Sequence, residues 1–231
     1  MKIPLSQRLL TCCSYIHPND RVADIGCDHG YLGIYLLCSG IAQSVIAADV
    51  NEQPLHSAMI NATKFGVRQQ MSFYLSDGVR NIPQDFDTMV CAGMGGDTMI
   101  SILSAAPWLR SSKYRLILQC QSKTPVLRRY LSEQGWTISQ ETLVKDGKFI
   151  YSVMEVIYKS GGNLEPWQWY ISAPILASHS PLLPEYYERI RQGIYLNVEG
   201  LRRTNAPQLS QQELLLDQID KLKGDIYGNC S

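Results

Sequence analysis

Short apolar runs alternate with amphipathic stretches along the first two thirds of the chain. Apolar runs bounded by turn-forming residues are typical of strands, whereas apolar positions that recur every three or four residues are typical of helices. The pattern predicts strands at residues 21–25, 44–49, 71–75, 87–92 and 115–120, and helices at residues 4–16, 31–38, 53–65, 97–105 and 124–135. Strands that alternate with helices imply an α/β fold in which helices cover both faces of a mostly parallel sheet.

Two longer strand-like runs, residues 136–144 and 149–158, follow the last of these helices. Between them stands the segment Lys145-Asp146-Gly147-Lys148. An Asp-Gly pair between two strand-like runs is a strong signal for a β-hairpin. The parallel sheet is therefore expected to end in an antiparallel hairpin.

Beyond residue 158 the pattern becomes helical after a linker-like segment at residues 159–163. Two apolar stripes at helical spacing, joined by residues 205–207, predict an αα-hairpin. Pro184 can open the first helix, and the run from Ser210 to Glu213 matches a capping box for the second. The stripes consist of Tyr187, Ile190, Ile194 and Leu201, and of Leu215, Ile219 and Leu222. The chain is thus predicted to form two domains, residues 1–160 and residues 161–231.

Charge and cysteine content narrow the possible function classes. The 21 basic and 21 acidic residues give a formal net charge of zero, so overall charge gives no support to a nucleic-acid substrate, while a local basic face remains compatible with one. None of the seven cysteines forms a CxxC pair or stands beside a histidine at metal-ligand spacing, so we expect reduced thiols and no metal. We also expect no membrane span and a cytoplasmic location, because long apolar runs and a signal-peptide core are both lacking.

The first candidate site follows the first predicted strand. Glycines at such a strand-to-helix turn let the backbone approach a ligand, and the helix start offers free N–H groups. Gly26, Gly30 and Gly33 give the spacing GxxxGxxG rather than the GxGxxG of dinucleotide sites. A carboxylate at Asp24 suits a cationic amino acid group better than a pyrophosphate, which it would repel. The segment favours S-adenosylmethionine over NAD, with Asp24, Gly26, Cys27 and Gly30 as the expected binding residues.

Acidic residues follow the next two strands. Asp49 lies 25 residues after Asp24, close to the offset of about 20 residues at which an acidic residue binds ribose hydroxyls in Rossmann folds. Asp77-Gly78 comes just after the third strand, where a carboxylate could meet the amino group of an adenine. An ordinary turn explains either feature taken alone. Their order along successive strands favours cofactor binding.

A glycine-rich segment, residues 92–97, follows the fourth strand. Ligands bind at this end of a parallel sheet, and three glycines leave room for a flat substrate beside the cofactor. We expect Gly93 and Met94 to contact the cofactor. Methyltransferases that act on exocyclic amines often carry an Asn/Asp-Pro-Pro-Tyr/Phe segment here, and its absence from this chain counts against such an acceptor.

Two runs carry a specific resemblance: residues 24–32, DIGCDHGYL, and residues 92–96, AGMGG. They resemble motifs of the bacterial TrmK-type tRNA (adenine(22)-N(1))-methyltransferases, which usually have Pro where this chain has Gly33 and often Ser where it has Cys27. The resemblance implies a class I, Rossmann-like methyltransferase domain and a small C-terminal helical, coiled-coil-like domain. It also implies S-adenosyl-L-methionine as cofactor and N1 of adenine 22 in tRNA as the methyl acceptor.

The chemistry of such an acceptor is compatible with the loop that follows the first predicted strand, which we call the first loop. Adenine N1 has a free lone pair and needs positioning and a suitable field more than a base. Methylation leaves a cationic ring, which Asp28 is placed to stabilise, and Tyr31 is our candidate for orienting or stacking the base. N1 is hidden in a paired duplex, so the adenine must be unpaired or flipped out. The C-terminal helices are candidates for gripping the tRNA.

Three alternatives remain open at this point. The neutral charge favours a methyltransferase that acts on a small molecule or a protein. A non-catalytic cofactor-binding or interaction module could use the same fold. A nicotinamide oxidoreductase is disfavoured by the glycine spacing and by the terminal hairpin. The pattern does not indicate an oligomeric state.

Overall fold

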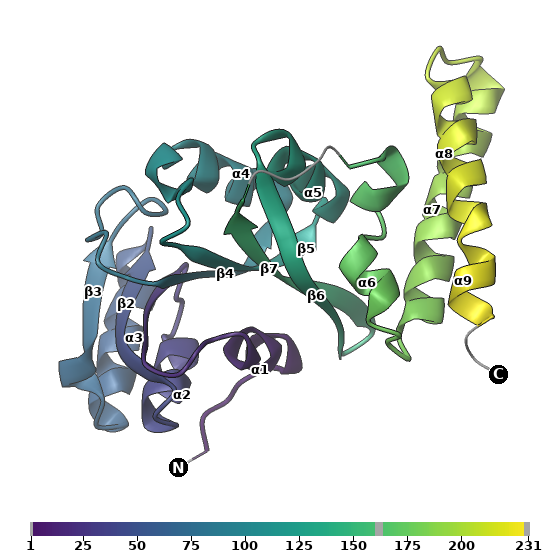
Figure 1. The fold of residues 1–231 in the computed structure, drawn as a ribbon. Coiled ribbons are helices and arrows are strands. Elements are labelled where there is room, and N and C mark those ends of the chain that lie inside the picture. Colours follow the sequence, from purple (N-terminus) through teal and green to yellow (C-terminus); the bar gives the residue numbers. More distant parts are fainter. Residues whose placement is uncertain (1, 160–163, 229–231) are drawn as a thin grey trace.

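A computed structural model describes residues 2–159 and 164–228 (Figure 1). The described residues contain a seven-stranded sheet in the order β3-β2-β1-β4-β5-β7-β6. The parallel strands are β1 (Asp20–Ile25), β2 (Ala42–Asp49), β3 (Met71–Leu75), β4 (Thr88–Gly95) and β5 (Arg115–Ser122). An antiparallel hairpin, β6 (Trp136–Asp146) and β7 (Phe149–Tyr158), completes the sheet through the pairing of β7 with β5. The predicted fold class is confirmed.

Helices cover both faces of the sheet, as Figure 1 shows. One face carries α1 (Gln7–Ser14), α2 (Tyr31–Cys38) and α3 (Glu52–Lys64), and the other carries α4 (Gly96–Ser104) and α5 (Thr124–Glu133). Alternate residues of β1 point to opposite faces, so Val22 packs in the first core and Ala23 and Ile25 pack in the second. Short 3-10 turns, η1 (Arg68–Gln70) and η2 (Pro107–Leu109), connect some of these elements.

The C-terminal part begins with η3 (Pro166–Trp169) and α6 (Ala173–Ala177) beside the hairpin edge of the sheet. It continues as a helical arm of α7 (Leu183–Thr204), α8 (Leu209–Lys221) and α9 (Lys223–Tyr227), which stands beyond that edge in Figure 1. This part has its own apolar core, to which Leu143 and Ile150 of the hairpin also belong. The predicted domain boundary at residues 160 and 161 lies outside the described residues, and the division remains a prediction.

Several local predictions differ from the structure. The first helix begins at Gln7 rather than residue 4, because Ser6 is extended (φ −73°, ψ 161°) at its N-cap. The capping box at Ser210 is wrong: a turn closed by the Leu209 N–H on the Ala206 carbonyl (3.0 Å) already starts α8. The pattern also missed η3 and α6, which are too short to show a period.

Strand β4 is longer than predicted and includes Gly93, Met94 and Gly95. Its pairing with β5 is irregular there, with register shifts on either side of Met94. Gly93 adopts φ 80°, and its N–H donates to the side chain of Gln119 at 3.1 Å. The glycine-rich segment is therefore a distorted strand end rather than a loop.

Candidate active site

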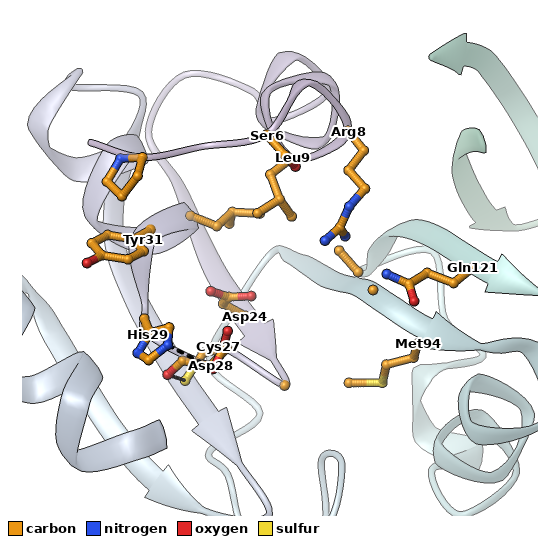
Figure 2. Close-up of a pocket in the computed structure, with 15 residues that line it drawn as sticks. Ser6, Arg8, Leu9, Asp24, Cys27, Asp28, His29, Tyr31, Met94 and Gln121 are labelled. Atoms are coloured by element: carbon orange, nitrogen blue, oxygen red, sulfur yellow. Dashed lines mark hydrogen bonds and ion pairs between the residues drawn. The ribbon is translucent and has the colours of Figure 1, made fainter. Parts of the chain in front are cut away.

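A cavity of about 560 Å³ opens at the carboxyl ends of β1 and β4 (Figure 2). The strand order reverses between these two strands, and open α/β sheets bind their ligands at such a point. Seven of the predicted site residues line the cavity: Asp24, Gly26, Cys27, Asp28 and Tyr31 from the β1–α2 segment, and Gly93 and Met94 from β4. A volume of this size is typical of small-molecule sites.

The loop after β1 keeps its shape through glycine. Gly26 has φ 71°, and a Cβ there would overlap the Cε atom of Met94. The N–H groups of Gly26 and Cys27 both donate to the Ala48 carbonyl, at 2.8 and 3.0 Å. The predicted glycine turn is therefore present, and it brings the backbone of the first loop against the side chain of Met94 in β4.

Asp24 is the most unusual group of the cavity. Its side chain is only 4% exposed, and among the described residues its Oδ2 atom has no hydrogen-bond partner. Burial and the neighbouring carboxylates of Asp49 and Asp28 raise its pKa to about 7, against the lowering effect of the Gly33 N–H. A buried carboxylate that lacks a cation is costly. The cavity therefore offers a ready partner to a positively charged ligand group.

Asp49 ends β2 and fixes the backbone of the first loop. Its Oδ2 atom accepts the N–H of Asp28 at 3.1 Å, and its Oδ1 atom accepts the N–H of Asn51 at 2.9 Å. Asp28 itself has a φ of 49°, a backbone conformation that residues other than glycine seldom adopt. Asp49 does not line the cavity, and its ribose-binding role remains a prediction.

The side chain of Asp28 is 71% exposed at the rim of the cavity. The Nε2 atom of His29 lies 3.7 Å from its Oδ1 atom, as the dashed line in Figure 2 marks. The ring of His29 in turn lies near the ring of Tyr31, with the two centroids 6.0 Å apart. The loop thus presents a carboxylate and two rings at the cavity entrance.

Besides Asp49, three predicted residues lie outside this cavity. Gly30 (φ 72°) is the N-cap of α2, and a Cβ there would come within 2.9 Å of the Cβ atom of Ala58 in α3. Asp77 is exposed with its Oδ2 atom 3.5 Å from Arg80, and Gly78 packs against Ile102. The cofactor-binding roles predicted for Gly30, Asp77 and Gly78 remain untested predictions.

The structure also brings residues to the cavity that the sequence pattern did not single out. Arg8 of α1 donates from Nη1 to the Oε1 atom of Gln119 at 2.9 Å, and its Nε atom lies 3.3 Å from Asp146 in the hairpin turn. Gln121 from the end of β5 lines the cavity opposite Asp24, as Figure 2 shows. Gln119 could have been suspected, since it is a polar residue in an otherwise apolar strand. Arg8 carried no local signal, because its partner is 111 positions away.

No three histidine, cysteine, aspartate or glutamate side chains within residues 2–159 and 164–228 are grouped so that they could hold a metal ion. No helix in the same residues combines the length and apolar character needed to cross a membrane.

Comparison with known proteins gives consistent matches. A family described as a methyltransferase domain matches residues 5–154. The tRNA (adenine(22)-N(1))-methyltransferase of Bacillus subtilis is 31% identical over 66% of this chain and 65% of its own length. The chain spans less than two thirds of the curated relatives that it matches first.

Solved structures match nearly the whole chain. The crystal structure of the B. subtilis m1A22 tRNA methyltransferase TrmK has a TM-score of 0.85 and 25% identity, and the match covers 97% of this chain and 100% of that one. The Streptococcus pneumoniae protein Sp1610, in complex with S-adenosyl-L-methionine, has a TM-score of 0.77 and 25% identity over 96% of this chain and 100% of that one. The C-terminal helices therefore belong to the shared architecture.

Proposed function

The chain belongs to the methyltransferase-domain family, which covers residues 5–154, and on that premise we propose that it is an S-adenosylmethionine-dependent tRNA methyltransferase acting on N1 of adenine 22. The observation that carries the cofactor assignment is the buried, unpartnered Oδ2 atom of Asp24 at the end of β1. The relatives from B. subtilis support the tRNA acceptor. The cytoplasm, where tRNA is modified in bacteria, is the expected location.

The cavity residues fit the cofactor. Asp24 would hold its ammonium group, because a cation beside this buried carboxylate removes the cost of leaving the charge unpaired. The glycine-bearing backbone at Gly26 and Cys27 would lie along its amino acid part, since no side chain of Gly26 blocks the approach. The bound cofactor supplies an electrophilic methyl group on a sulfonium sulfur.

Little chemistry is then needed from the side chains. Adenine N1 attacks with its own lone pair, so a C–N bond forms, the C–S bond breaks and S-adenosylhomocysteine leaves. The positive charge moves to the adenine ring, and no proton has to be removed. The exposed carboxylate of Asp28 would stabilise that charge, and Tyr31 would orient the base at the rim. Catalysis would rest mainly on positioning within the cavity.

The acceptor is tested by incubating the protein with labelled S-adenosylmethionine and unmodified tRNA, followed by digestion to nucleosides. We expect labelled 1-methyladenosine from wild-type tRNA and none from tRNA that carries guanosine at position 22. Cofactor binding without any labelled nucleoside would remove the tRNA acceptor and favour the small-molecule or protein acceptor that the zero net charge allows.

The role of Asp28 is tested with Asp28→Ala against Asp85→Ala. Asp85 is a matched control, because its side chain is 76% exposed and it lies just before β4, at the amino end of that strand and away from the cavity at its carboxyl end. We expect Asp28→Ala to lower kcat at least tenfold, a loss of about 1.4 kcal/mol of transition-state stabilisation, with an unchanged Kd for the cofactor. Near-normal turnover of a folded Asp28→Ala protein would refute the role.

A further inference from the structure

A second cavity, of about 410 Å³, opens next to the first, and Gln121 lines both. Its walls are the carboxyl end of β5, the start of α5, the start of β7 and the first turns of α7. It therefore lies where the sheet meets the helical arm. Neither the predicted cofactor residues nor Asp28 line it.

The wall residues combine a flat aromatic surface with positive charge. Phe149 is 43% exposed, and Arg189 of α7 and Lys148 stand over its ring, 5.8 and 5.3 Å from the centroid. Lys123 at the start of α5 adds a third cation, which pairs with Asp97. Among the described residues no aspartate or glutamate lines the cavity, and neither Lys148 nor Arg189 pairs with a carboxylate. Such a surface is complementary to a base and a phosphate.

The β6–β7 turn connects this cavity to the first one. Asp146, at the start of the turn, holds Arg8 of the first cavity through a 3.3 Å ion pair. Three residues later, Phe149 lines the second cavity, and the neighbouring Lys148 contacts the ring of Phe149. A strand of RNA that places one base in the first cavity would therefore meet the second within a short distance along its backbone.

We propose that the second cavity, which we call the flanking-nucleotide cavity, binds a nucleotide adjacent to the methylated adenine. The base stacks on Phe149, and the phosphate is held by Arg189 and Lys123. This inference rests on the proposed function, because it takes single-stranded or flipped-out RNA as the ligand. Stacking on an aromatic ring accepts any base, so the cavity would contribute affinity and register rather than sequence recognition.

The test compares Phe149→Ala, Phe149→Trp and Arg189→Ala with a matched pair elsewhere. Arg68 lies 4.7 Å from the ring centroid of Phe73 on β3, at the far edge of the sheet, so Arg68→Ala and Phe73→Ala remove the same kind of cation–aromatic pair away from both cavities. For each variant, calorimetry gives the Kd for S-adenosylmethionine, and fluorescence anisotropy gives the Kd for unmodified tRNA at several salt concentrations.

We expect Phe149→Ala to bind tRNA about tenfold more weakly, which corresponds to about 1.4 kcal/mol, and Phe149→Trp to retain wild-type binding. Arg189→Ala should bind more weakly and lower the slope of log Kd against log salt by about 0.7, the value of one phosphate contact on a single strand. The Kd for S-adenosylmethionine should stay unchanged in all of them, and both control variants should bind tRNA normally.

Unchanged tRNA binding by Phe149→Ala and Arg189→Ala would overturn the inference, and so would an equal loss in the control variants. If Phe149→Ala also loses the cofactor, the protein is misfolded, and Arg189→Ala with Phe149→Trp decides. Wild-type protein that binds tRNA but forms no 1-methyladenosine would refute the proposed function, while the binding data would still decide on the flanking-nucleotide cavity.

Discussion

Arg128 of α5 is fully buried and joins the sheet to the C-terminal part of the chain. Its guanidinium donates to the Glu141 carboxylate on β6 at 2.7 Å and to the carbonyls of Trp169 and Tyr170 at 2.8 Å each. It also donates to the Tyr186 hydroxyl of α7 at 3.2 Å. One side chain therefore contacts the hairpin, η3 and the first turn of the helical arm.

Replacing this residue by Arg128→Met keeps much of the apolar volume and removes every one of these hydrogen bonds. Glu141 would remain buried with the Ser172 hydroxyl (2.5 Å) as its remaining side-chain partner among the described residues. The Trp169 carbonyl would lose its side-chain donor, and the Tyr170 carbonyl would keep only the Tyr186 hydroxyl (3.3 Å). Breaking a buried ion pair in this way costs about 3–5 kcal/mol. That is a large part of the 5–15 kcal/mol by which domains are typically stable, and it corresponds to a decrease in Tm of roughly 6–20 °C.

Urea unfolding followed by circular dichroism and by tryptophan fluorescence measures the loss. The neighbouring Arg129 is the control, because its pair with Glu133 is exposed and Arg129→Met should cost less than about 1 kcal/mol. The double variant Arg128→Met/Glu141→Leu should recover most of the stability, since no buried charge is then left unpaired. A cost below about 1 kcal/mol for Arg128→Met, or a double variant less stable than Arg128→Met, would refute the reasoning.

Two further predictions concern the first loop. The raised pKa of Asp24, about 7, means that the folded protein holds this proton more tightly than the unfolded chain, so the cofactor-free protein should lose stability as the pH rises from about 4 to about 7. Asp24→Asn should remove that part of the pH dependence and weaken cofactor binding at least tenfold. Thermal unfolding across this pH range measures the first effect, and calorimetry measures the second. An unchanged Kd for the cofactor would count against Asp24 as the residue that holds its ammonium group. Gly26→Ala should lower the free energy of unfolding in urea by at least about 2 kcal/mol, because the new Cβ would stand on a left-handed backbone and overlap Met94. The control Gly40→Ala has a similar backbone (φ 66°) but no neighbour within 4 Å, and it should cost only about 1 kcal/mol. Equal costs for the two glycine variants would show that Met94 yields without strain.

The parts of the site that the sequence predicted are those with local causes. The turn after β1 depends on glycines within a few residues of each other, and the hairpin depends on one Asp-Gly pair, so both could be recognised from the pattern. Arg8 reaches the cavity only because α1 crosses the sheet toward Gln119, and no local pattern encodes that contact. The same holds for Arg128, because its partners are 13 to 58 positions away.

The anchoring of the arm has a further consequence. Helix α7 has 22 residues and is therefore about 33 Å long, and its first turn is tied to the sheet by Tyr186 and by the ion pair between Lys145 and Glu185. Because the helix has a constant length and is anchored at one end, it sets the distance between the sheet and its own far end. An RNA that contacts both the cavities and the far end of α7 must match that length. Adding or deleting a base pair between the two contact points would therefore weaken binding more than exchanging one pair for another.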